Sequence, residues 1–289
     1  MDKLLIIADL EDTCHAIPRG LALAAALGQA PEVVAFTYAP LKRLKVDATQ
    51  QTAMRKRLMQ ERENNVQALI DKHRHQDQKV KLKVVWSKDL AGWINKRCSE
   101  GGYAAVIKTA HRSESLLHKP TDWRLLRECP VPVMLVAEKN WSKTKPVLAT
   151  LDLSTTVASK RRLNHKVLGN ALRLSQALGA ELQIISAIEV PTVLADLGLI
   201  ESVDYVRSAE AEMAQQISKL AASFDLPESI FTCKPGPVEK VVSKHADKIK
   251  AQIVVMGTVG RSGVRAALMG NSAERILQIL QTDVWALKP

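Results

Sequence analysis

The sequence predicts an α/β protein of two tandem doubly wound, Rossmann-like domains, each with a five-stranded parallel sheet. An internal repeat is the first observation: ALGQAPEVVAFTYAP at 26–40 aligns without a gap with ALGAELQIISAIEVP at 177–191. The second is that each copy alternates short β-rich runs with longer helical patterns, as βαβ units do. Composition is the third: 46% of the 289 residues are apolar and only 4% are aromatic, which suits parallel sheets covered by helices.

The repeat extends beyond its best-matched core. LLIIADLED at 4–12 aligns with VLATLDLST at 147–155, so each copy opens with an apolar strand that ends at an aspartate, Asp9 or Asp152. Near the other end, AAVIKTAHRS at 104–113 aligns with IVVMGTVGRS at 253–262. We therefore expect one domain at 1–138 and a second at 145–289, joined by a polar linker.

The second copy shows its elements most clearly. Strands are predicted near 147–152, 181–188, 229–233, 252–257 and 283–287, and helices near 160–178, 204–224, 237–249 and 272–281. Right-handed crossovers place the first strand in the centre, beside the fourth. Ligands of such sheets bind beyond the carboxyl ends of the strands, so Asp152 and Gly257 are expected to meet there.

A long helix over 52–75 is predicted in the first copy. Its apolar residues recur at roughly helical spacing, which is more typical of a core-facing stripe than of a cofactor groove. The stripe consists of Met54, Leu58, Met59, Val66, Leu69 and Ile70.

Charge and cysteine content exclude several classes of protein. The net charge of +11 is spread over short clusters such as Lys160-Arg161-Arg162, which we interpret as solvated surface. Nucleic acid is disfavoured as a partner because aromatic residues are not interleaved with these clusters. The excess charge favours small anionic ligands. The four cysteines form no CxxC pair and are expected to be free thiols rather than metal ligands.

The same sequence shows no membrane signal. No apolar run approaches the ~20 residues that a membrane span needs. The opening MDKLLIIADLED places acidic residues where a signal peptide would not. We therefore expect a cytoplasmic protein without membrane contact.

The stretch MGTVGRSGVRAALMGNSAERILQIL at 256–280 carries the clearest chemistry. Gly257 ends a strand, Gly260 and Gly270 follow, and Asn271 and Ser272 open a helix in which Asn271 and Glu274 have capping-box spacing. Glycines permit close approach of a phosphate and unusual φ angles, and the helix N-terminus supplies N–H groups. A turn followed by a capped helix explains the same spacing. The loop has neither the Walker nor the GxGxxG pattern.

Gly257-x2-Gly260-x9-Gly270 followed by a small polar residue resembles the ATP-binding signature of universal stress proteins. The tandem layout, with GTVGRSG, GNSAE and TDWRLLRECPVPV, is similar to the E-type group of that family. The resemblance spans both halves. It implies strand order 3-2-1-4-5 in each domain and ATP as ligand, which Mg²⁺ could accompany.

The resemblance also implies residue roles in the second half. Asp152 would lie beside the nucleoside, and Ala187 and Ile188 would flank the adenine. The phosphates would be wrapped by Gly257, Gly260, Gly270, Asn271 and Ser272, and Met256 and Arg261 complete the predicted nucleotide-binding set. One departure is that Asn271 stands between the third glycine and Ser272.

The first half departs from the signature more completely. Lys108 and His111 stand where the second half has Gly257 and Gly260, and no glycine occurs from 103 to 140. The corresponding loop includes Asp122 and Trp123, which we interpret as packing residues. We expect this half to have lost ATP binding or to hold another ligand.

Three functions stay open at this point. The first is a stress-response regulator that binds ATP or a related nucleotide-type anion without robust catalysis. The second is a weak ATPase or nucleotidyl-transfer enzyme, although no nucleophile, general base or metal site stands out. The third is a scaffold that binds a ligand other than a nucleotide.

The resemblance implies dimerisation through the last strands, here Val133–Val136 and Val284–Leu287. Pairing within the chain gives an intrachain pseudo-dimer of the two domains. Pairing between chains gives a homodimer and is left open.

Overall fold

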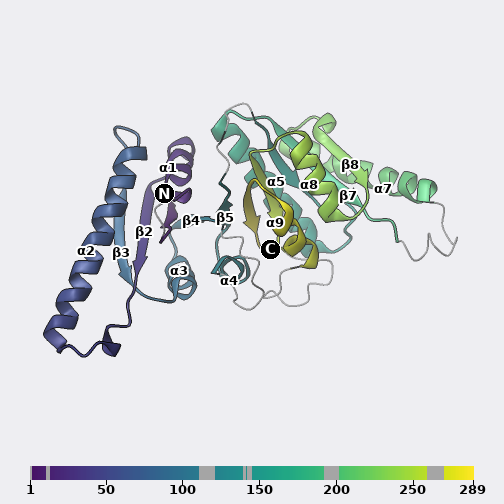
Figure 1. Ribbon diagram of the computed structural model, residues 1–289. Coiled ribbons are helices and arrows are strands. Elements are labelled where there is room, and N and C mark those ends of the chain that lie inside the picture. Colours follow the sequence, from purple (N-terminus) through teal and green to yellow (C-terminus); the bar gives the residue numbers. More distant parts are fainter. Residues whose placement is uncertain are drawn as a thin grey trace. The chain divides into compact units, whose positions relative to one another are not determined.

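The computed structural model describes residues 2–10, 14–110, 121–138, 141, 145–191, 202–258 and 270–289 (Figure 1). It divides into two compact units, Met1–Glu138 and Lys139–Pro289, which we describe separately. Among the described residues, no helix combines the length and the hydropathy of a membrane span.

The first unit alternates strands and helices as the repeat predicts. Its elements are β1 (Lys3–Ala8), α1 (Ala16–Leu27), β2 (Pro31–Thr37), the 3-10 turn η1 (Leu41–Arg43), α2 (Ala48–His73), β3 (Lys81–Trp86), α3 (Leu90–Ser99), β4 (Tyr103–Thr109), α4 (Thr121–Glu128) and β5 (Val133–Val136). The strands are parallel and lie in the order β3-β2-β1-β4-β5.

The second unit repeats this plan. Its elements are β6 (Val147–Thr150), α5 (Ala158–Leu178), β7 (Leu182–Ile188), α7 (Ser202–Phe224), the 3-10 turn η2 (Glu228–Ile230), β8 (Phe231–Pro235), α8 (Val238–Lys248), β9 (Ile253–Gly257), α9 (Asn271–Ile279) and β10 (Asp283–Leu287). The order is β8-β7-β6-β9-β10, again parallel. Both units therefore confirm the predicted order 3-2-1-4-5.

The first strand of each unit is its buried centre. Ile6 of β1 is aligned with Val33 on one side and Ile107 on the other, and Ala149 of β6 is aligned in the same way with Ile184 and Val255. All of these side chains are fully buried, as expected of a parallel sheet covered by helices.

The repeated Leu-Gly pair explains why both first helices end where they do. Gly28 after α1 and Gly179 after α5 have φ angles of 63° and 59°, in the left-handed region that favours glycine. Each glycine N–H bonds back to carbonyls of the last helical turn. The two copies therefore turn from helix to second strand by the same C-cap.

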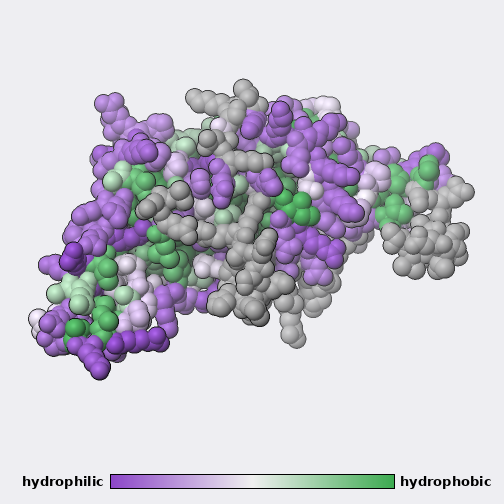
Figure 2. All heavy atoms as spheres, in the orientation of Figure 1, coloured by the Kyte–Doolittle hydropathy of each residue, from purple (hydrophilic) through white to green (hydrophobic). Residues whose placement is uncertain are grey.

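Helix α2 departs from the predicted core-facing stripe. Of its 26 residues only Val66 and Ile70 are buried, and Met54 is 39% exposed. In Figure 2 the surface over much of α2 is hydrophilic. The helix begins with a capping box, in which Asp47 accepts from the Gln50 N–H and the Gln50 side chain accepts from the Asp47 N–H. The predicted core-facing stripe is thus fully buried only at Val66 and Ile70. The first half of the helix contacts the sheet mainly through its surface, where the Arg55 guanidinium lies 5.3 Å from the centre of the Trp86 ring.

Candidate functional site

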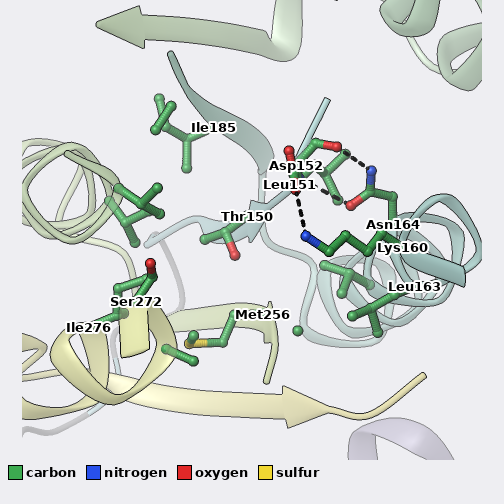
Figure 3. A pocket seen from close by; sticks show the side chains of 16 residues that line it. Thr150, Leu151, Asp152, Lys160, Leu163, Asn164, Ile185, Met256, Ser272 and Ile276 are labelled. Carbon is green, nitrogen blue, oxygen red and sulfur yellow. Dashed lines mark hydrogen bonds and ion pairs between the residues drawn. The ribbon is translucent and has the colours of Figure 1, made fainter. Parts of the chain in front are cut away.

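The carboxyl ends of β6, β7 and β9 border a cavity of about 110 Å³ in the second unit (Figure 3). Helix α5 forms one wall and the first turns of α9 form another. Five residues of the predicted set line it, namely Asp152, Ala187, Met256, Gly257 and Ser272. The expected meeting of Asp152 and Gly257 at this edge of the sheet is therefore observed.

The remaining predicted residues lie elsewhere. Ile188 borders an adjoining cavity of about 400 Å³, together with Asp152 and residues of α7. Gly270 and Asn271 start α9 but line neither cavity. Gly260 and Arg261 lie outside the described residues.

Asp152 is held in place by helix α5. Its N–H donates to Asn164 Oδ1 at 3.1 Å, and Asn164 Nδ2 donates to its carbonyl at 2.8 Å. The carboxylate accepts a hydrogen bond from Ser154 Oγ at 3.0 Å and lies 3.7 Å from Lys160 Nζ. The side-chain amide of Asn164 thus fixes the backbone of the loop after β6. The carboxylate of Asp152 takes no part in these two bonds and is directed to the edge of the cavity (Figure 3).

Lys160 also lines this cavity, although its cluster with Arg161 and Arg162 predicted solvated surface. Its side chain is only 12% exposed, whereas Arg161 and Arg162 beside it are exposed. The signal was its spacing, because Lys160 shares a helix face with the cavity-lining Leu163, Asn164 and Val167. A lysine on a stripe that otherwise faces the core needs space and polar contacts for its charge, which a cavity at the end of the stripe supplies.

Gly257 has a packing role in addition to its place in the cavity wall. A Cβ at this position would lie 2.6 Å from Leu163 Cδ2, too close for a carbon contact. Leu163 is a buried residue of α5. The glycine therefore lets α5 pack closely on the end of β9.

The start of α9 differs from the predicted capping box. Gly270 is the N-cap, Asn271 is the first helical residue, and no side chain caps this end. The φ angle of Gly270 is −71°, which any residue can adopt, so the expected unusual φ was wrong at this position. Its N–H donates to the Thr258 carbonyl at 2.9 Å. The first-turn N–H groups have no partners within the helix and can meet an anion.

The corresponding place in the first unit holds a buried ion pair. Lys108 Nζ lies 2.8 Å from Asp122 Oδ1, and it donates to the Thr109 carbonyl at 2.9 Å. Lys108 occupies the β4 position that Gly257 has in β9, and Asp122 is the second residue of α4, as Ser272 is of α9. Asp122 was expected to pack in a loop, and this was wrong, since it supplies a carboxylate at a helix N-terminus. His111 lies outside the described residues.

A sequence model of the universal stress protein family matches residues 157–288, which is most of the second unit. Residues 157–288 therefore form a domain of the universal stress protein family. Universal stress protein E of Escherichia coli K12 is 28% identical over 260 residues, covering 88% of this chain and 82% of its own. The universal stress protein E homolog of Haemophilus influenzae is 26% identical over 250 residues, covering 84% and 81%.

Solved universal stress protein structures share the fold over the full length. A putative universal stress protein from Pseudomonas aeruginosa UCBPP-PA14 has a TM-score of 0.71 at 22% identity, and covers 100% of this chain and 94% of its own. One from Archaeoglobus fulgidus DSM 4304 has a TM-score of 0.64 at 16% identity, and covers 99% and 96%. At these identities the structures bear on the fold alone.

Proposed function

We propose that this universal stress protein is a stress-response regulator whose second domain binds ATP or a related nucleotide-type anion. One observation carries the proposal: a single cavity brings the Asp152 carboxylate and the first turn of α9 together at the carboxyl ends of the strands. A carboxylate accepts hydrogen bonds from the hydroxyl and amino groups of a nucleoside. The N–H groups of a helix N-terminus bind phosphate.

We further propose that only the second domain binds nucleotide. In the first domain a carboxylate of the chain, Asp122, stands at the helix N-terminus where a phosphate would approach. The Asp122 carboxylate already occupies the place that a phosphate would take, and Lys108, the cation that could bind the phosphate, is already paired with it. Opening that site would also break a buried ion pair, which is costly.

Catalysis receives less support. Asp152 is the one carboxylate among the described residues that line the first cavity, and Ser154 and Lys160 already contact it. A hydrolase or nucleotidyl transferase needs a positioned base or metal ligands. A weak ATPase is the second candidate, and a scaffold that binds another ligand is the third.

Mg²⁺ can accompany ATP without a protein cage. The described residues contain no group of three or more His, Cys, Asp or Glu side chains suited to a metal ion. Mg²⁺ usually keeps several waters and binds through substrate phosphates. We therefore assign any Mg²⁺ to the phosphates of the ligand.

Domain boundaries and partners stay predictions. We propose 1–138 and 145–289 as the two domains, associated as an intrachain pseudo-dimer, in a cytoplasmic protein without nucleic-acid or membrane partners. Small-angle scattering tests the association, since two freely moving lobes would contradict it. Light scattering tests whether chains also form homodimers.

Calorimetric titration of the full chain with ATP tests the function. We expect one site per chain, weakened in Asp152→Asn. Steady-state hydrolysis should stay near background. Binding of two equivalents would contradict the asymmetry, and turnover in the usual enzyme range of ~1–1000 per second, lost in Asp152→Asn, would favour the enzyme. Absence of ATP binding, with another small molecule released from purified protein in mass spectrometry, would favour the scaffold.

A further inference from the structure

Lys160 places a cation inside the proposed nucleotide site. Its side chain is 12% exposed, and its ammonium lies 3.7 Å from Asp152 Oδ2. That distance is too long for a hydrogen bond. Asp152 is the sole ion partner of Lys160 among the residues that the structure describes. A nearly buried ammonium with three donors and one distant partner retains capacity to bind another anionic oxygen.

Lys160 also stands at the junction of two cavities. It lines the smaller cavity beside α9 and the larger one bordered by Ile188, Tyr205 and Met213. In Figure 3, Lys160 from α5 and Ser272 from α9 approach the smaller cavity from opposite sides. A ligand that extends from one cavity into the other therefore passes the ammonium.

Charge orients such a ligand. Phosphates are favoured at the α9 N-terminus and disfavoured beside the Asp152 carboxylate. The larger cavity, with the apolar Ile188 and Met213 and the aromatic Tyr205, suits a base. The sugar then lies by Asp152, and the phosphate attached to it comes next to Lys160.

We propose that Lys160 makes this site select phosphorylated nucleosides over free nucleosides by binding the phosphate attached to the sugar. The inference rests on the proposed nucleotide function and narrows it. Lys160 exchanges its long pairing with Asp152 for a charge-assisted hydrogen bond to the ligand. Since the first phosphate is common to AMP, ADP and ATP, the contribution of Lys160 is the same for all three.

Titration of the full chain with adenosine, AMP and ATP at low salt tests the proposal. Lys160→Gln keeps much of the side-chain length and removes the charge. We expect it to weaken AMP and ATP by a similar factor, about tenfold or more, and to leave adenosine within about twofold. Lys160→Arg should retain most of the preference. Lys166→Gln is the matched control, since Lys166 lies exposed on the same helix.

Each outcome discriminates. Unchanged AMP and ATP affinity in Lys160→Gln, with ATP still bound by the unaltered chain, overturns the role of Lys160 and leaves the proposed function intact. Equal losses for adenosine and ATP also overturn it, because Lys160 would then act only by ordering Asp152. An unaltered chain that binds none of the three ligands contradicts the proposed function itself. A loss confined to the two phosphorylated ligands, absent from Lys166→Gln, supports the proposal.

Discussion

Lys108 Nζ and Asp122 Oδ1 lie 2.8 Å apart in the first domain, with 4% and 8% of their side chains exposed. The pair joins the end of β4 to the first turn of α4. The corresponding elements of the second domain, β9 and α9, border an open cavity. The same fold therefore holds a filled site in one copy and an open one in the other.

Removing one member of this pair should destabilise the first domain strongly. Lys108→Met leaves a buried carboxylate without its cation, and Asp122→Asn leaves a buried ammonium without its anion. Each should lower the free energy of unfolding by about 3–5 kcal/mol, whereas Lys108→Met with Asp122→Leu should cost much less. Urea unfolding followed by circular dichroism measures this. Single variants within about 1 kcal/mol of the parent would show that the pair is not structurally important.

Ser272→Asp should close the second site in the manner of the first. The new carboxylate would lie on the helix position that Asp122 occupies in α4 and would repel phosphate. We expect ATP affinity to fall at least about tenfold, the scale of a lost charge-assisted hydrogen bond. Calorimetry gives the affinity, and Ser272→Asn is the control for the loss of the hydroxyl alone. Equal weakening in both variants would assign the effect to the hydroxyl rather than to charge.

Gly257→Ala tests the packing of α5 on β9. The added Cβ meets Leu163 at 2.6 Å, and Leu163 is buried, so the helix or the leucine must shift. Overpacking of this kind costs about 1–3 kcal/mol. Combining Gly257→Ala with Leu163→Val should recover part of the loss, which thermal or urea unfolding would detect. Purely additive losses would indicate that the two positions do not compete for the same space.

His245 should make the second domain sensitive to acid. Burial lowers the pKa of His245 below its ordinary value of 6.5, and the neighbouring cations Lys234 and Lys248 lower it further. Its Nδ1 lies 3.4 Å from Lys234 Nζ, and its Nε2 has no partner among the described residues. The folded chain therefore keeps this histidine neutral under conditions in which the unfolded chain protonates it.

The sign of the pH effect follows. Above pH 6.5 both states are neutral at His245, and below it only the unfolded state gains the proton, so stability falls by at most about 1.4 kcal/mol per pH unit. His245→Gln should reduce the loss of stability between pH 7.5 and 5.5 in urea unfolding. His75→Gln, at an exposed position, is the control. A parent and His245→Gln with parallel pH profiles would contradict this mechanism.

The sequence was sufficient for the fold because its signals are local and repeated. Strand-ending Asp9 and Asp152, the glycine stops at Gly28 and Gly179, and the alternation of elements each depend on a few neighbouring residues. Parallel βαβ chirality then leaves few arrangements. The central place of the first strand beside the fourth, and with it the meeting of Asp152 with Gly257, follow from those rules, whereas the full order 3-2-1-4-5 was implied by the family resemblance.

The side-chain chemistry of the site was less accessible. Lys160 and Asp152 are eight residues apart across a loop, and the pairing of Lys108 with Asp122 joins a strand to a helix in the same domain. Helical spacing could place Lys160 on the inward face of its helix, but which charged groups pair depends on three-dimensional packing that residue spacing does not encode. The φ angle of Gly270, −71°, could not be predicted from residue type either, because glycine adopts negative φ angles as readily as positive ones.

Helix α2 depends on short-range interactions for much of its length. Its first half is held mainly by the Asp47–Gln50 box and by pairs one turn apart, Arg57 with Glu61 and Gln60 with Asn64. The Arg55 guanidinium adds a contact with the Trp86 ring, and burial begins only at Val66. Exposed pairs of this kind contribute about 0.2–0.5 kcal/mol each. Backbone amides before Val66 will therefore exchange their hydrogens with solvent sooner than those around Ile70. A protease that cuts after basic residues will meet Arg55, Lys56 and Arg57 in the segment that opens first.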